Sequence, residues 1–289
     1  MDLATFLIQV LNGVQYGFML FLVASGLTLI FGVMGIINIA HGAFYMIGAY
    51  LAFWLTGVVG NFFLAIVLGI PLMVAIGYVV ERLAITHLYH RDHLYQVLLT
   101  YGLILIFNEA QKLLWGTGFH GVRVPAILSG AVPLTDTLVY PHYRLFISVV
   151  CLGIAAGMYV AINRTKLGMM IRAGASDREM VEALGIDIGR VFAIVFSLGA
   201  ALAGFSGMIG APVSSVYPGM GDQILIISFV VVVIGGIGSI KGAFVGAMLI
   251  GLADTFGQVL LPELSSMVVY TLMAIVLFWW PQGLFGRRV

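Results

Sequence analysis

The sequence predicts an all-α fold: a polytopic transmembrane bundle of about eight or nine helices, with broken or re-entrant segments and one helix outside the membrane. Three observations predict it. Hydrophobic residues make up 62% of the 289 residues and charged residues only 9%, which is too little charge to cover a soluble domain. Apolar runs recur at about the length that crosses ~30 Å of hydrocarbon. The 37 glycines suit close helix packing and buried, broken helices.

Nine apolar segments are expected to cross or enter the membrane. They lie at about 6–33, 40–58, 61–80, 95–114, 144–162, 190–210, 222–238, 242–261 and 267–281. Several are short or rich in glycine, so eight spans plus one re-entrant piece is the alternative. We expect residues 1–289 to form a single transmembrane domain, with the N-terminal stretch belonging to the first span because it lacks a basic n-region.

The distribution of Lys and Arg predicts the orientation. The segments 81–93, 163–190 and 238–241 and the C-terminal tail hold ten of the 13 basic residues. Cytoplasmic loops carry an excess of basic residues, so these four segments and the C-terminus are expected in the cytoplasm. The segment 115–143 is then a loop on the outer side.

Two similar stretches mark interruptions between spans. MGIINIAHGAF (34–44) and IGGIGSIKGAF (234–244) share five of eleven positions, and each stands where one apolar segment ends and the next begins. Interrupted helices often line the substrate route of transporters. Asn38 and His41 lie in the first interruption and are candidates for that route. For Asn38 we favour hydrogen bonding within the unwound turn, and we expect His41 nearer the cytoplasmic side than the midplane.

Charge is concentrated in one short segment. Nine of the 25 charged residues lie between Arg164 and Arg190. Ser176 starts a Ser-x-x-Glu capping box, a helix is expected over 177–184, and Gly185 is expected to end it in the left-handed conformation. Met180, Val181, Ala183 and Leu184 give this helix an apolar side, whereas Arg178, Glu179 and Glu182 are expected in water. So short a helix is marginal alone, and its apolar side needs a surface, either the membrane domain itself or a groove on a cytoplasmic partner.

Several stretches resemble the branched-chain amino acid (LIV) type of ABC importer permeases, and in particular the smaller of its two permease types. They are GMMIRAGASDREMVEALGIDIGRVFAIVFSLGAALAGFSGMI, NGVQYGFMLFLVASGLTLIFGVMGIINIAHGAFYMIGAYLAFWL, VVIGGIGSIKGAFVGA and PQGLFG, which occur in the order of the family. The resemblance implies that the charged segment is a cytoplasmic coupling loop. The residues it assigns to docking on the ATP-hydrolysing subunit are Ser176, Asp177, Arg178, Glu179, Met180, Val181, Glu182, Ala183, Leu184 and Gly185.

The same resemblance implies the partners and the place of action. They are two cytoplasmic ATPase subunits that hold ATP and magnesium, a second related permease or a second copy of this chain, an external solute-binding protein, and the lipid of a bacterial or archaeal inner membrane. The family implies branched-chain or related amino acids as cargo, moved by alternating access. Urea, amides and aromatic acids are the other cargoes, and a passive channel for urea or another small neutral solute is the rival function.

Asp254 is an ionisable residue inside the eighth apolar segment, where a carboxylate is costly and marks a candidate for the translocation path. It can meet a substrate ammonium group or pair with a protein donor such as Lys112. By length along its helix, it is expected past the midplane toward the outside.

Other chemistries find little support in the sequence. GGIGSIKGAF lacks the order of a P-loop, so ATP and magnesium are expected in other subunits, and this chain is expected to carry no catalytic residues and no cofactor. His87, His90 and His93 recur at three-residue steps, but structural zinc usually takes four ligands, and we expect no metal site. No basic stripe suggests nucleic acid.

Overall fold

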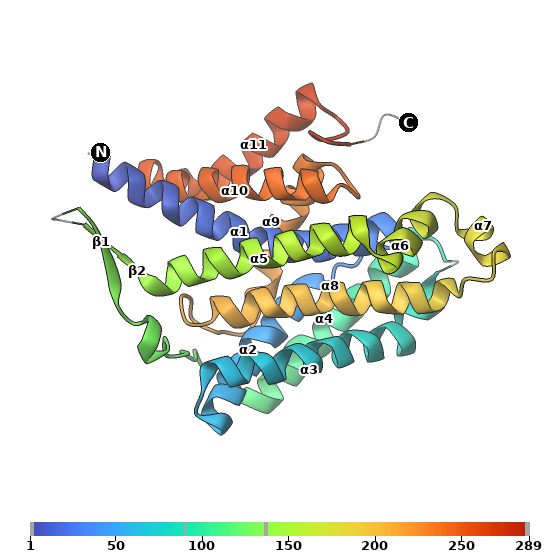
Figure 1. The fold of residues 1–289 in the computed structure, drawn as a ribbon, viewed down its shortest axis with the longest axis horizontal. Coiled ribbons are helices and arrows are strands. Elements are labelled where there is room, and N and C mark those ends of the chain that lie inside the picture. The colour runs from blue at the N-terminus through green and yellow to red at the C-terminus, as the bar shows by residue number, and fades with distance from the viewer. Residues whose placement is uncertain (1–2, 90, 136–137, 287–289) are drawn as a thin grey trace.

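The computed structural model describes residues 3–89, 91–135 and 138–286 and is mainly helical, as predicted (Figure 1). In that part of the chain, nine apolar helices coincide with the nine predicted segments. They are α1 (Leu3–Met34), α2 (His41–Val59), α3 (Phe62–Leu83), α4 (His93–Trp115), α5 (His142–Arg164), α8 (Ile188–Gly210), α9 (Met220–Gly235), α10 (Ile240–Leu260) and α11 (Ser265–Trp279). Seven are long and apolar enough to cross a membrane.

The helices α9 and α11 are the short ones, with 16 and 15 residues. At 1.5 Å per residue, α9 is about 24 Å long, which is less than the ~30 Å of hydrocarbon. Its first turn packs against the first turn of α2, because a Cβ at Gly221 or at Gly42 would collide with the backbone of the other residue. The short helix α9 therefore starts inside the bundle, which fits the predicted broken segments.

The centre of the bundle is built from α1, α2 and α8. The most apolar windows of these helices are 78%, 61% and 83% buried. Their backbones touch at glycines: a Cβ at Gly26 of α1 would lie 2.6 Å from the Gly199 carbonyl oxygen of α8, and Gly48 of α2 meets Gly204 of α8. Small residues permit this close approach between helices.

The other long helices surround this centre. Figure 1 shows α10 (orange) beside α1 (blue) and α3 (teal) beside α8 (yellow-orange). The helices α4 and α5 lie farther out, and their apolar windows are only 17% and 11% buried. Both carry large exposed apolar side chains, as expected of surfaces that face lipid or a partner helix.

The predicted cytoplasmic segments share one end of the molecule. This end holds α6 (Lys166–Ser176), α7 (Arg178–Ala183), the 3₁₀ turn η1 (Ile85–Leu88) and the last described residues (Figure 1). Contacts confirm their proximity, because the Leu284 backbone N–H donates to Ile234 and the ring of Tyr89 packs on Phe192. Arg287 and Arg288 of the predicted tail lie outside the described residues. The four segments are thus arranged as the orientation prediction requires.

The opposite end carries the N-terminus and the segment predicted to be external. This segment contains the 3₁₀ turn η2 (Ala126–Leu128) and an antiparallel hairpin of β1 (Ala131–Thr135) and β2 (Leu138–Pro141), with Val132 opposite Tyr140. A further 3₁₀ turn, η3 (Pro262–Leu264), joins α10 to α11. The small hairpin and an isolated β-bridge between His120 and Val216 are the departures from the all-α prediction within the described residues.

Candidate functional site

The charged segment forms two helices, α6 and α7, and the cap of α7 corrects the prediction. The Asp177 carboxylate oxygen Oδ1 accepts from the Met180 N–H at 3.0 Å, and the Asp177 backbone is extended, as an N-cap requires. Ser176 is instead the last residue of α6, so it is not the cap, and Glu179 stands one position too early for a capping box. The helix runs over Arg178–Ala183 rather than 177–184.

The end of α7 agrees with the prediction. Gly185 has φ of 82°, a left-handed conformation that favours glycine. Its N–H donates to the Glu182 carbonyl, and the Ile186 N–H donates to the Val181 carbonyl. These bonds satisfy two of the carbonyls that the helix end leaves free.

One face of α7 is open to solvent. The α7 outer face, as it is called below, consists of Glu179, Met180, Glu182 and Ala183 of the helix and the C-cap residue Leu184 directly after it. Met180 and Leu184 are 58% and 73% exposed, whereas Val181 is only 3% exposed and packs inward. The predicted apolar side of α7 is therefore divided. Val181 packs on the bundle, whereas Met180, Ala183 and Leu184 face outward together with the carboxylates of Glu179 and Glu182.

Arg178 was expected in water, and the structure corrects this. Its guanidinium donates to the Met34 carbonyl and, at 3.5 Å, to the Val33 carbonyl. It also lies over the Phe192 ring of α8, 5.1 Å from the ring centre. Sequence position alone cannot show this, because the acceptors lie more than 140 residues away and are backbone atoms.

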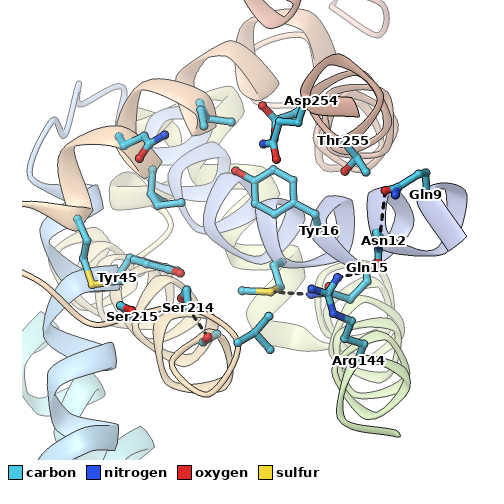
Figure 2. Close-up of a pocket in the computed structure, with 18 of the residues that line it drawn as sticks. Gln9, Asn12, Gln15, Tyr16, Tyr45, Arg144, Ser214, Ser215, Asp254 and Thr255 are labelled. Carbon is cyan, nitrogen blue, oxygen red and sulfur yellow. Dashed lines mark hydrogen bonds between the residues drawn. The ribbon is translucent and has the colours of Figure 1, made fainter. Parts of the chain in front are cut away.

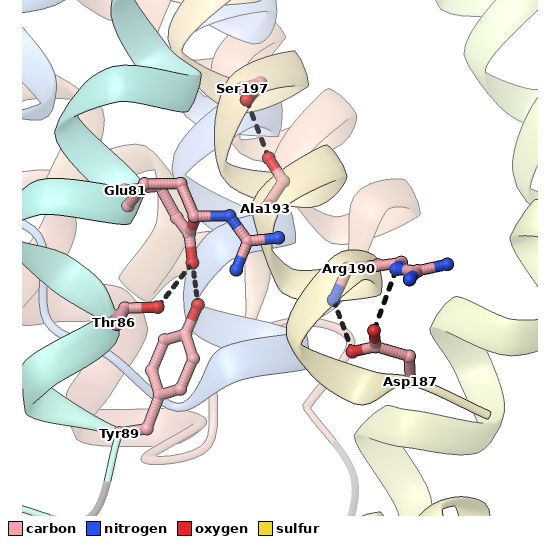
Figure 3. A network of polar contacts seen from close by, with 8 residues as sticks. Glu81, Thr86, Tyr89, Asp187, Arg190, Ala193 and Ser197 are labelled. Carbon is pink, nitrogen blue, oxygen red and sulfur yellow. Dashed lines mark hydrogen bonds and ion pairs between the residues drawn. The ribbon is translucent and has the colours of Figure 1, made fainter. Parts of the chain in front are cut away.

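A buried carboxylate stands beside this contact. Glu81, at the end of α3, is fully buried, and its Oε1 accepts from the hydroxyls of Thr86 and Tyr89 (Figure 3). The Arg82 side chain lies 3.6 Å from the other carboxylate oxygen. Burial raises the pKa of the Tyr89 hydroxyl and the bond to Glu81 raises it further, so Tyr89 stays a donor at neutral pH. The Tyr89 ring meets Phe192 edge-on at 5.0 Å.

A cavity of about 420 Å³, called the outer cavity below, lies toward the end that carries the segment predicted to be external, between α1, α9, α10 and the start of α5. Its wall is unusually polar for this chain. The polar residues that line it are Gln9, Asn12, Gln15, Tyr16, Tyr45, Arg144, Ser214, Ser215, Tyr217, Gln223, Asp254, Thr255 and Gln258. Figure 2 shows Asp254 and Arg144 on opposite walls, with Tyr16 between them.

Asp254 faces this cavity, and its partner is not the predicted one. Its Oδ2 accepts from Gln258 Nε2 at 2.7 Å, one turn later on α10. Lys112 pairs with Glu109 at 2.6 Å instead. On the opposite wall, Arg144 donates to Asn12 Oδ1 at 2.6 Å. Among the described residues neither Asp254 nor Arg144 has an ion-pair partner, so the cavity holds one carboxylate and one guanidinium that hydrogen-bond to neutral side chains.

Asn38 and His41 occupy the interruption between α1 and α2, and both are fully buried. The Ala40 N–H donates to Asn38 Oδ1 at 3.1 Å, which is the hydrogen bond within the turn that we favoured. His41 is held inside the bundle, on the side where the predicted cytoplasmic segments lie, since Val23 is nearer to Met34 than to Leu3 of α1. Its Nε2 donates to the Val23 carbonyl at 2.9 Å, and Val23 lies eleven residues before the end of α1, about 16 Å along the helix. Neither residue lines the cavity described above.

A second cavity of about 740 Å³ opens at the end that carries α6. The ends of α1, α5, α6 and the turn between α9 and α10 line it, with Arg172 and Lys241 as its charged residues. The two cavities lie at opposite ends, and His41 lies between them along α1, because it contacts Val23, whereas the outer cavity reaches Met19 and the second cavity begins at Thr28. His90 of the predicted histidine group lies outside the described residues.

Comparison with known proteins gives consistent results. Residues 9–277 match the family model described as branched-chain amino acid transport system / permease component. The chain is 32% identical to the high-affinity branched-chain amino acid transport system permease protein BraD of Pseudomonas aeruginosa, covering 98% of this chain and 96% of BraD. It is 29% identical to LivH of Escherichia coli K12 over the same shares, and 27% identical to LivM of that organism, over 90% of this chain and 66% of LivM. No solved structure matches.

Proposed function

Because this chain belongs to the family of branched-chain amino acid transport system permease components, we propose that it is a membrane subunit of an ATP-driven importer that moves branched-chain amino acids by alternating access. The observation that carries the proposal is the similarity to BraD and LivH along 98% of the chain, since both are named as permeases for this cargo. A passive urea channel is not favoured, because such a channel would have no use for an exposed, capped helix beside its helix bundle.

In this proposal, the cytoplasmic ATPase subunit docks on the α7 outer face. Two exposed apolar side chains, Met180 and Leu184, stand beside two carboxylates on a helix too short to be stable alone. A groove on a cytoplasmic ATPase would bury the apolar pair and match the acidic pair with basic residues. The ATPase, which holds ATP and magnesium, can drive reorientation only if it contacts α7 differently in its different states.

A second permease completes the membrane part. The chain is similar to LivH and, more distantly, to LivM, which are both named as permease proteins of one transport system in one organism. We therefore place a LivM-like partner, rather than a second copy, beside this chain, and an external solute-binding protein above both. The weakly buried helices α4 and α5 offer apolar surface for lipid or for this partner. The assembly is placed in the inner membrane with the C-terminus in the cytoplasm.

The outer cavity is the first part of the path in this proposal. It lies at the end where a solute-binding protein would deliver cargo, and Asp254 offers a carboxylate to the ammonium group of an amino acid. The hydrogen bond from neutral Gln258 does not neutralise the Asp254 carboxylate, and no described cation forms an ion pair with it. Asn38 and His41 act farther in, where they hold the interruption that has to rearrange as the path opens.

The test is a pair of charge reversals on the α7 outer face, Glu179→Lys with Glu182→Lys, in the co-expressed importer. We expect normal insertion, loss of the ATPase subunits on affinity purification and loss of leucine uptake in membrane vesicles. Glu263→Lys makes the same change on an exposed residue at the opposite end and should leave attachment and uptake unchanged. Full uptake by the double variant would reject the docking role of α7.

A further inference from the structure

Helix α7 is joined to the bundle by few contacts. It has six residues, of which Val181 is buried and the α7 outer face is exposed. Among the described residues, Arg178 carries the only side chain of α7 that hydrogen-bonds to a membrane helix. A force applied to α7 therefore reaches the bundle through the apolar contact of Val181 and the polar contacts of Arg178.

The atoms that Arg178 contacts are suited to a cation. The carbonyls of Val33 and Met34 are among the last four of α1, which have no partner within the helix and carry partial negative charge. The aromatic face of Phe192 supplies a further favourable contact for the guanidinium. One guanidinium nitrogen, Nη2, contacts both carbonyls while the planar group lies over the ring, and the compact ammonium of a lysine lacks this flat surface.

The α1 terminus that Arg178 contacts leads directly into the interruption before α2. Gly35 has φ of 66°, and a Cβ there would stand 3.0 Å from the Arg178 guanidinium. Two residues later the Ile37 N–H donates to Gln96 of α4 at 3.3 Å, and the chain then reaches His41 and the start of α2. A displacement of the α1 end would therefore tilt or shift the interruption and the first turn of α2.

The first turn of α2 is packed too tightly to absorb such a displacement. His41 is bonded to the Val23 carbonyl, and Gly42 touches the backbone of Gly221 at the start of α9. Packed elements of this kind change between discrete arrangements rather than deforming gradually. The starts of α2 and α9 would thus move together with the end of α1.

A second series of contacts connects the Arg178 side chain to α3. Phe192, beneath the Arg178 guanidinium, also meets the ring of Tyr89, and the Tyr89 hydroxyl is bonded to the buried Glu81 (Figure 3). Arg178 thus contacts the end of α1 and the start of α8 directly, and it is connected through Phe192 and Tyr89 to the end of α3.

We propose that Arg178 is the positioning residue that transmits movement of α7 to the interruption between α1 and α2, and so couples ATP hydrolysis to transport. This inference depends on the proposed docking of an ATPase on α7 but differs from it. The α7 outer face binds the ATPase subunit, whereas Arg178, on the inner side of the same helix, transmits the movement of α7 to the membrane helices. Contact geometry alone does not establish energetic coupling, so the test measures coupling itself.

The experiment uses the complete importer in proteoliposomes and measures three quantities: ATPase subunits retained per permease, the rate of ATP hydrolysis, and leucine transported per ATP hydrolysed. For Arg178→Ala we expect the ATPase to stay attached and active while leucine transported per ATP falls by about ten-fold, as loss of a charge-assisted bond would allow. Arg178→Lys, which keeps the charge but loses the planar group over the Phe192 ring, should be intermediate.

The matched control is Arg190→Ala. Arg190 lies at the same end, is exposed and is paired with Asp187 at 2.8 Å on its own helix, so removing it should leave all three quantities unchanged. An Arg178→Ala importer with normal leucine transport per ATP would overturn the inference. So would loss of the ATPase from this variant, because Arg178 would then serve docking or folding of α7. If the wild-type chain retained no ATPase, the proposed function itself would fail.

Discussion

The helices α5 and α8 have the same length, 23 residues, and a very different place in the molecule. The most apolar 18-residue window of α5 has a mean hydropathy of 2.4, against 2.0 for that of α8. Yet 83% of the apolar window of α8 is buried inside the protein and only 11% of that of α5. In a membrane protein, hydropathy indicates which segments leave water for the membrane, but it does not indicate which of these helices forms the protein core.

Their glycines explain the difference. In α8, a Cβ at Gly199, Gly204, Gly207 or Gly210 would press on α1, α2 or α3. In α5, a Cβ at Gly153 or Gly157 would have no atom within 4 Å. Glycine contributes to packing only where a second backbone approaches, and α5 has no such neighbour along most of its length. It touches the core mainly through Tyr143, Ile147 and Cys151 in its first half.

The largest expected effect is a loss of stability on replacing a packed glycine of α8 by alanine, compared with the same change at an exposed glycine of α5. Gly207→Ala would place a methyl group against the Tyr45 carbonyl of α2, and backbone cannot move aside as a side chain can. We expect a loss of at least about 3 kcal/mol of stability and little folded protein in detergent. Gly153→Ala on α5 should change stability by less than about 1 kcal/mol. Thermal unfolding followed by size-exclusion chromatography measures both, and equal effects would contradict the comparison.

An intermediate effect is expected where α5 does meet the candidate site. Its first turn carries Arg144 into the outer cavity, opposite Asp254. For Arg144→Gln, and likewise for Asp254→Asn, we expect leucine uptake to fall by roughly ten-fold with little loss of stability, because neither charge is ion-paired within the described residues. Initial uptake rates at saturating binding protein provide the measurement.

The control for these two variants is Lys112→Gln. Lys112 is a basic residue near the outer end of α4, and it is paired with Glu109 away from the cavity. Its removal should leave uptake unchanged. If it lowered uptake as much as Arg144→Gln does, the effect would come from the general charge of the outer end rather than from the cavity.

The smallest expected effect concerns the attachment of α5 to α8. The Tyr143 hydroxyl donates to the Ile209 carbonyl at 2.8 Å, and both are buried. Tyr143→Phe should cost about 1 kcal/mol, since one buried carbonyl loses its partner. Tyr159→Phe on the exposed part of α5 should cost nothing measurable. A larger loss from the second change would show that the outer part of α5 also packs on protein.

Features that depend on local chemistry could be predicted from the sequence. The nine apolar segments, the short helix in the charged segment and the left-handed Gly185 follow from hydropathy and from the conformational freedom of glycine. The turn at Asn38 follows from the tendency of Asn to bond the backbone two residues on. The cap was misplaced by one residue because Ser176 and Asp177 are both good caps, and the extension of α6 through Ser176 decides between them.

Features that depend on distant contacts could not be predicted. Nothing near Arg178 in the sequence indicates that its acceptors are the carbonyls of Val33 and Met34. The hydrogen bond from His41 to the Val23 carbonyl depends on how far the chain turns back along α1 after Gly35, and no periodicity in the sequence encodes that distance. Asp254 and Arg144 lie 110 residues apart, and only the packing of α1 and α10 beside the first turn of α5 brings them to one cavity.

The most direct test of the central claim is the accessibility of the α7 outer face. The chain has a single cysteine, Cys151, which is fully buried, so a cysteine introduced by Glu182→Cys would be the only exposed thiol. Its rate of reaction with a water-soluble maleimide is measured for the permease alone and for the importer with its ATPase subunits bound. The account predicts fast labelling alone and strong protection in the complex. Equal labelling in both would contradict it.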